Sequence, residues 1–215
     1  MGSDDAGTLT DPRDFAIYNW IKIGTQIWMA ENLAYLPSVS SPAIGSTTVP
    51  YYYVYEYTGG NVFDAKLTGN YNAYGVLYNW AAAKTACPFG WHLPTDAEWT
   101  TITNYLANSG YGYQGSGSDI GKSLAATSGW TVNATAGTIG NDQSTNNDSG
   151  FSALPGGYRN LPSAFGSLGT HAYFWSLTGS GTLNAITRYL LYSSSEVTGY
   201  NHDIGYGFSV RCVRD

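Results

Sequence analysis

Two cysteines and three histidines are the residues of this chain whose side chains could carry redox or metal chemistry. Cys87 and Cys212 can pair in only one way if they pair at all, and the alternative is two buried free thiols. A disulfide between them would close a very long loop and stabilise the fold by about 4–5 kcal/mol on the chain-entropy account. His92, His171 and His202 are too scattered to form a recognisable metal-binding motif.

Acidic residues could supply a calcium site, but the signal is weak. Asp142 with Asp148, or Glu196 with Asp203, could offer the carboxylate oxygens that calcium prefers. Surface carboxylates are more often only solvated, so the sequence leaves a metal site open and predicts no cofactor. No Gly-x-Ser-x-Gly nucleophile elbow is present, and we expect no enzymatic activity.

Composition narrows the class of partner. Charged residues make up only 11% of the chain, the formal net charge is −6, and Lys and Arg do not cluster, so neither nucleic acid nor an anionic membrane surface is expected as a partner. No apolar run approaches the roughly 20 residues that a spanning helix needs. The chain is instead rich in Tyr, Gly, Ser and Asn, residues that binding surfaces favour. The low Lys content and the Tyr, Asn and Ser content also favour an oxidising, extracytoplasmic setting.

The elements that position these residues begin with a hairpin over residues 21–30, turning at Gly24-Thr25. A long loop over 34–70 holds one aromatic strand at 51–57. Helices are predicted over 77–86, by propensity, and from Thr95, where Thr95 and Glu98 form a capping box.

The second half of the chain reads as loops and strands. Residues 107–149 are rich in Gly, Ser, Thr and Asn, and from residue 150 the apolar period falls to two, with strands expected at 183–192 and 206–213. Two helices followed by short antiparallel strands and long loops, without a βαβ repeat, indicate an α+β fold. We expect a flexible, acidic segment over residues 1–15 and a single domain over 16–215.

Six blocks of residues carry a resemblance to a known family. In chain order they are 26–33 (QIWMAENL), 75–80 (GVLYNW), 87–99 (CPFGWHLPTDAEW), 156–159 (GGYR), 173–176 (YFWS) and 207–212 (GFSVRC). Together they resemble the Fibrobacter succinogenes major paralogous domain, from about residue 15 to the end of the chain. That domain is similar to the C-type lectin fold, in the branch shared with formylglycine-generating enzymes.

The resemblance implies an extracellular recognition protein that binds a protein or glycan. Such proteins are surface-exposed or lipid-anchored in gut bacteria, or are carried by their phages. Some relatives are variable proteins of diversity-generating retroelements, whose C-terminal region is diversified to vary ligand binding. The alternative is a structural cell-surface or assembly subunit without a diversified ligand site. A binder is expected to be a monomer, whereas a stable oligomer burying residues 183–206 would favour assembly.

The expected binding surface lies in the last third of the chain. Residues 185–192 alternate as a strand, and because the family pattern keeps residues of the types at Arg188, Leu190 and Tyr192 fixed, those three are assigned to the frame. The other strand face and a polar loop over 193–203 then form the site. The predicted ligand-binding residues are Thr187, Tyr189, Leu191, Ser193, Tyr200, Asn201, His202 and Asp203, with His171 nearby.

The resemblance also bears on the two cysteines and on other activities. Cys87 and Cys212 suit a structural disulfide that clamps the terminal strand, and five tryptophans (Trp28, Trp80, Trp91, Trp99 and Trp175) are expected to build the core. Formylglycine-generating relatives need redox-active cysteines at a substrate groove, which these positions do not suit. The usual calcium-lectin motifs Glu-Pro-Asn, Gln-Pro-Asp and Trp-Asn-Asp are absent, although Tyr and Trp faces could hold a sugar without metal.

Overall fold

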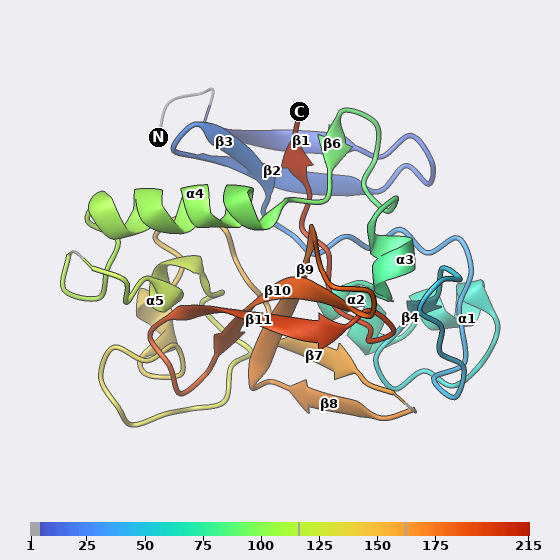
Figure 1. Cartoon of the computed structure of the whole chain (residues 1–215). Coiled ribbons are helices and arrows are strands. Elements are labelled where there is room, and N and C mark those ends of the chain that lie inside the picture. Colours follow the sequence, from blue (N-terminus) through green and yellow to red (C-terminus); the bar gives the residue numbers. More distant parts are fainter. Residues whose placement is uncertain (1–4, 116, 162) are drawn as a thin grey trace.

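The computed structural model describes residues 5–115, 117–161 and 163–215. It has two large sheets, and the first contains strands from both the N-terminal and the C-terminal end of the chain (Figure 1). This five-stranded antiparallel sheet has the order β1-β2-β3-β12-β6. Its strands are β1 (Ala6–Thr10), β2 (Ile17–Ile23), β3 (Gln26–Met29), β12 (Val213–Arg214) and β6 (Trp91–His92). The C-terminal strand thus lies between the N-terminal hairpin and the middle of the chain.

The N-terminal part confirms one prediction and corrects another. Strands β2 and β3 pair with Ile23 opposite Gln26, which confirms the two-residue turn, and Gly24 takes the positive φ of 62° that this turn needs. The expectation of a flexible segment over 1–15 is wrong for β1, because backbone pairing with β2 orders it despite its polar sequence. Residues 1–4 of that segment lie outside the described residues.

The second sheet is built mainly from the last third of the chain. Its order is β11-β10-β9-β7-β8, antiparallel except where β7 meets β9. The strands are β7 (Gly156–Arg159), β8 (Phe165–Leu168), β9 (His171–Ser180), β10 (Asn184–Leu191) and β11 (Val197–Asp203). The loop predicted over 193–203 is therefore wrong from Val197 onward, because the segment pairs in continuous register with β10.

One helix dominates the α content. Helix α4 (Asp96–Asn108) starts at the predicted capping box, with Thr95 Oγ1 accepting from Glu98 N and Glu98 Oε2 accepting from Thr95 N. In Figure 1 it lies between the two large sheets. The remaining helices are one or two turns long: α1 (Val62–Lys66), α2 (Gly69–Tyr74), α3 (Trp80–Ala83), α5 (Gly121–Leu124) and a 3₁₀ turn over Gln143–Thr145.

The helix predicted over 77–86 is shorter than expected. Strand β5 (Leu77–Tyr78) occupies its start and pairs with β4 (Tyr52–Tyr53), the part of the predicted aromatic strand that forms a regular strand. Tyr78 also exchanges both backbone hydrogen bonds with Phe208, so tertiary pairing overrides helix propensity there. Asn79 then caps α3 through its side chain.

The core forms where α4 meets both sheets. Trp99 of α4 packs on Trp28 of β3 at 4.8 Å between ring centroids and on Phe174 of β9 at 5.6 Å. Four of the five tryptophans predicted for the core are buried, and the exception, Trp80, is partly exposed and donates Nε1–H to the Ser176 carbonyl.

The end of the chain joins the two sheets instead of forming the strand predicted over 206–213. Ser209 N donates to Tyr173 O in the second sheet, while Val210 O accepts from Leu33 N and Cys212 O from Met29 N. Only Val213 and Arg214 are in a regular strand, because the segment before them changes partner with nearly every residue. The predicted disulfide is confirmed: Cys87 and Cys212 are bonded, with their Cα atoms 5.9 Å apart.

Across the three described stretches, every helix is too short or too polar to cross a bilayer. The disulfide is of the kind that persists in oxidising compartments and is consistent with an extracytoplasmic location.

Candidate binding surface

Strands β9, β10 and β11 give the second sheet two different faces, because successive side chains of a strand point to opposite sides. On one face Arg188 donates Nε–H to Asp96 Oδ1 of α4 at 2.7 Å, and Leu190 is fully buried in the core. This confirms the assignment of Arg188 and Leu190 to the frame. The other face turns away from α4 and carries a group of aromatic rings.

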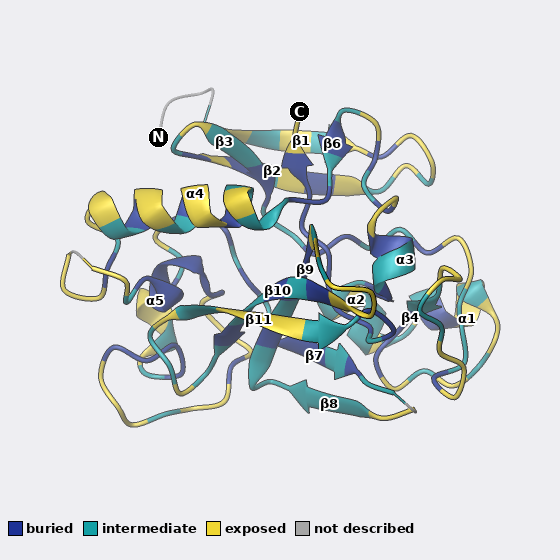
Figure 2. Ribbon diagram, in the orientation of Figure 1, coloured by how far each residue is buried: buried dark blue, intermediate teal, exposed yellow. Residues whose placement is uncertain are grey.

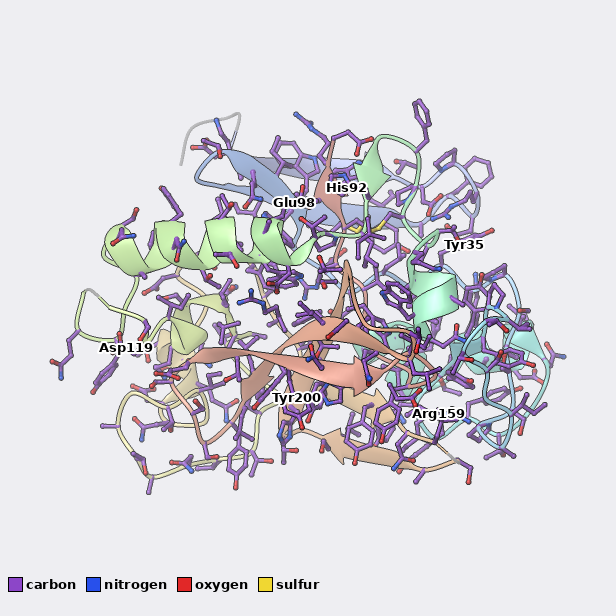
Figure 3. The ribbon with its side chains drawn as sticks, in the orientation of Figure 1. Tyr35, His92, Glu98, Asp119, Arg159 and Tyr200 are labelled. Atoms are coloured by element: carbon purple, nitrogen blue, oxygen red, sulfur yellow. A yellow bond between two sulfur atoms is a disulfide. The ribbon has the colours of Figure 1, made fainter. Side chains whose placement is uncertain are left out.

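We call this group the aromatic face. Its members are partly exposed tyrosines and histidines from β7, β9, β10, β11 and the turn after β11: Tyr158, His171, Tyr173, Tyr189, Tyr200, His202 and Tyr206. Figure 3 shows the ring of Tyr200 projecting from β11 on the side away from α4.

Tyr173 is the centre of the aromatic face. Its ring lies 5.2 Å from that of His171, nearly parallel to it, and 5.4 Å from that of Tyr189. The rings of Tyr158 and His202 contact it edge-on at 5.8 and 5.5 Å. The fully buried Phe208 lies beneath it at 4.9 Å. These contacts hold the rings in fixed positions, so little side-chain entropy is left to lose when a partner covers them.

Both histidines of the aromatic face are held in the same way. Thr187 Oγ1 donates to the Tyr200 carbonyl at 3.1 Å and lies 2.8 Å from His202 Nδ1. Thr170 Oγ1 donates to the Ser167 carbonyl at 3.0 Å and lies 3.0 Å from His171 Nδ1. Each hydroxyl thus anchors the Nδ1 side of its imidazole, which fixes the orientation of the ring.

The two imidazoles are neutral at pH 7. Burial lowers the pKa of His202 to about 4, and burial also lowers the pKa of His171 below its ordinary value. The aromatic face therefore presents ring surfaces, tyrosine hydroxyls and imidazole nitrogens without a histidine charge. Such a surface can stack on planar or apolar groups and accept hydrogen bonds from N–H or O–H donors.

The structure brings five of the predicted site residues together on the aromatic face or at its rim. His171, Tyr189, Tyr200 and His202 belong to it, and Leu191 extends it opposite His171 in the β9–β10 register. Tyr200 is 59% exposed, the most accessible of its rings.

The other four lie elsewhere. Thr187 is fully buried, so its predicted exposure is wrong; its hydroxyl is hydrogen-bonded to the Tyr200 carbonyl and to His202 Nδ1. Asn201 and Asp203 alternate with Tyr200 and His202 and so belong to the opposite side of β11. Ser193 is exposed in the turn after β10.

Three members of the aromatic face were not predicted from the sequence. Tyr173 lies two residues after His171 on β9, so strand alternation alone could have placed it beside His171. Tyr158 and Tyr206 come from separate segments that meet only through the fold, with their rings 6.3 Å apart.

The acidic pairs considered for calcium have different surroundings. Asp142 and Asp148 line a hollow with Lys122, whose buried ammonium group donates to the carbonyl oxygens of Asn141 and Asp142. Glu196 and Asp203 flank β11 at opposite ends. Within the described residues, no three or more His, Cys, Asp or Glu side chains are grouped to hold a metal ion.

Comparison with known proteins identifies one family. A family model described as the Fibrobacter succinogenes major domain matches residues 21–214 of the chain. No curated protein and no solved structure matches it.

Proposed function

Because the chain belongs to the Fibrobacter succinogenes major domain family, we propose that it is a non-enzymatic recognition protein that binds a protein or glycan through the aromatic face. The observation that carries this proposal is the cluster around Tyr173, where five tyrosines and two neutral histidines share one side of a sheet. A ring that only fills a core is buried, whereas each of these seven keeps part of its surface accessible.

The energetics of the aromatic face also support binding. Aromatic side chains dominate the binding free energy of many interfaces, since they offer large contact areas with few rotatable bonds. Here the ring of Tyr173 rests on the buried Phe208, and Arg188 ties strand β10 to Asp96 of α4. A partner would therefore meet a surface that is already ordered.

We further propose a C-type lectin-like arrangement of the domain and a location on a cell surface or a virion. Family membership and the disulfide support both. Diversification by a retroelement is a separate part of the proposal. The flanking DNA tests it: a neighbouring reverse transcriptase gene and a near-copy of the 3′ end of this gene are the expected finding, and their absence would remove this part.

The binding proposal is tested on arrays of glycans and of bacterial surface proteins, probed with the purified chain. A ligand found in this way should bind the double variant Tyr189→Ala/Tyr200→Ala at least about tenfold more weakly, because loss of two anchor rings costs more than about 1.4 kcal/mol. The matched control is Tyr105→Ala/Tyr113→Ala, which removes two tyrosines of 40% and 45% exposure from α4 and the loop after it. Equal binding by both double variants would refute the site, and a stable oligomer that covers the aromatic face would favour the assembly role instead.

A further inference from the structure

Strand β11 forms one edge of the second sheet. It pairs with β10 on one side, and the strand order β11-β10-β9-β7-β8 places no described strand on its other side. Figure 2 shows that the middle of β11 is exposed, and the exposed residues are Gly199, Tyr200 and Asn201. The aromatic face is formed by side chains of this strand, whereas the backbone N–H and C=O groups of the strand are a separate set of possible contacts.

The hydrogen-bond pattern shows which backbone groups of β11 point outward. Ile204 N donates to Leu183 O at 3.0 Å, and the β10–β11 register continues from there without a shift. Antiparallel pairing alternates between hydrogen-bonded and non-hydrogen-bonded pairs. The backbone N–H and C=O groups of residues 198, 200 and 202 therefore bond to β10, and those of residues 197, 199, 201 and 203 point away from it. The N–H and C=O groups of Gly199 and Asn201 have no partner in the described parts of the chain.

These outward groups fit an extended backbone. They repeat every second residue, at a spacing of about 6.8 Å in a strand, with a donor and an acceptor at each point. A peptide strand has that same repeat, whereas sugar hydroxyls do not. Natural edge strands usually carry Lys, Pro or a bulge that prevents strand addition. Strand β11 (VTGYNHD) contains no Lys or Pro, and its pairing with β10 has no bulge.

Charge distinguishes a foreign segment from a second copy of this chain. Glu196 and Asp203 lie at the two ends of β11, no Lys or Arg occurs between Arg188 and Arg211, and Arg188 is already paired with Asp96. Self-pairing about Tyr200 would place Asp203 of one copy opposite Val197 of the other, and so would gather Glu196 and Asp203 at each end of the interface between molecules of formal charge −6 each. A segment with basic residues near its ends would be complementary instead.

The surroundings of the edge offer contacts on both sides of an added strand. On the α4 side, Arg188, Gly199 and Asn201 help to line a shallow hollow of about 370 Å³. On the other side is the ring of Tyr200. Alternate side chains of an added strand would therefore meet the hollow and the aromatic face in turn.

We propose that β11 binds an extended segment of a partner protein, flanked by basic residues, as a sixth strand of the sheet. This inference rests on the proposed function and narrows its ligand to a protein, because the backbone of Gly199 and Asn201 supplies hydrogen bonds while the aromatic face supplies side-chain contacts.

Proline at position 201 provides the test. Asn201 N–H points away from β10, so Asn201→Pro removes one outward donor and leaves the β10–β11 ladder intact, as proline does on edge strands. Asn201→Ala is the matched control, since it removes the side chain and keeps the N–H. The probe is a phage-displayed library of random peptides selected on the immobilised wild-type protein. Selected peptides should be enriched in Lys and Arg and should bind Asn201→Pro about tenfold or more weakly than Asn201→Ala.

Hydrogen exchange gives a second measurement that does not depend on the variant's folding. A selected peptide should slow exchange at the amides of Gly199 and Asn201 and leave those of Thr198 and His202 unchanged, since these two already bond to β10. The inference would be overturned if every selected peptide bound Asn201→Pro as well as it binds wild type. It would also be overturned if the wild-type protein were a dimer that Asn201→Pro abolishes. Peptides that lose binding in Tyr189→Ala/Tyr200→Ala but not in Asn201→Pro would overturn it while leaving the proposed function intact.

Discussion

The guanidinium group of Arg211 donates its Nε proton to Oδ1 of Asn32 at 2.8 Å, joining residues 179 positions apart in the chain. Arg211 is fully buried, and its other nitrogens donate to the carbonyl oxygens of Met29, Phe151 and Ser152. Burial lowers its pKa to about 9, which still leaves the group charged at pH 7. One side chain thus ties the terminal segment to the end of the N-terminal hairpin and to the loop before β7.

Replacing this arginine should strongly destabilise the fold. Arg211→Met leaves four acceptors without their donor, and we expect a loss of about 3 kcal/mol or more in the free energy of unfolding, measured by urea denaturation. The matched control is Arg214→Met, since Arg214 is exposed and lies over the Trp20 ring. Similar losses in the two variants would contradict this account.

Removing the disulfide should cost stability through the unfolded state. The Cys87–Cys212 bond closes a loop of 125 positions, and the double variant Cys87→Ser/Cys212→Ser should lose about 4–5 kcal/mol. Reduction of the wild type should reproduce most of this loss, and a reducing agent should leave the double variant unaffected. A double variant as stable as the oxidised protein would show that the crosslink adds nothing.

His92 should make stability depend on pH near neutrality. Its Nε2 lies 2.8 Å from Glu98 Oε1 and its Nδ1 lies 2.6 Å from Asp215 Oδ1 (Figure 3 labels His92 and Glu98 side by side). Although burial opposes the charge, these carboxylates raise the pKa of His92, while hydrogen bonds from Thr95 and His92 lower the pKa of Glu98.

The sign of that dependence follows from linkage. A raised histidine pKa stabilises the fold below its ordinary value of 6.5 and loses this effect as pH rises through the folded value. Near about pH 5.5, where Glu98 is still ionised, wild type should be more stable than His92→Gln by up to about 1 kcal/mol. Near about pH 8.5 this difference should be smaller. A difference that is constant with pH would rule out the ionic contribution.

His202 should make the stability of the fold depend on pH in the opposite direction. Burial lowers its pKa to about 4, so the unfolded chain takes up a proton at a higher pH than the folded protein does. Wild type should lose stability as pH falls from about 7 to about 4, and His202→Asn, which keeps a side chain able to hydrogen-bond to Thr187 Oγ1, should lose less over this range. Parallel pH profiles for the two proteins would contradict the assignment.

Lys122 should hold together the long segment before β7. Its buried ammonium group donates to the carbonyl oxygens of Asn141 and Asp142, and Lys122→Met should cost about 2–3 kcal/mol by leaving them unpaired. Hydrogen exchange should quicken over residues 121–149 in particular. Lys84→Met, which changes an exposed lysine over the Trp80 ring, is the control and should change stability little.

Local signals in the sequence were enough for the elements that depend on neighbouring residues. The hairpin turn at Gly24-Thr25 and the capping box at Thr95 and Glu98 each form within a few positions, and both occur as predicted. The strand period over 185–192 also put Arg188 and Leu190 on one face, and the family pattern assigned that face to the frame, where both side chains lie. Two cysteines allow a single pairing, so the disulfide could be named once an oxidising setting was inferred.

Tertiary structure alone decided the features that depend on distant partners. Residues 197–203 are polar and aromatic and became a strand because β10 offered a free edge, and Leu77–Tyr78 became a strand because Phe208 pairs with it. Thr187 was predicted to be exposed from alternation, which fixes the face of a residue but not whether rings from other strands cover it. The aromatic face likewise needs Tyr158 and Tyr206 to meet Tyr173 across three segments, and no local pattern encodes that meeting.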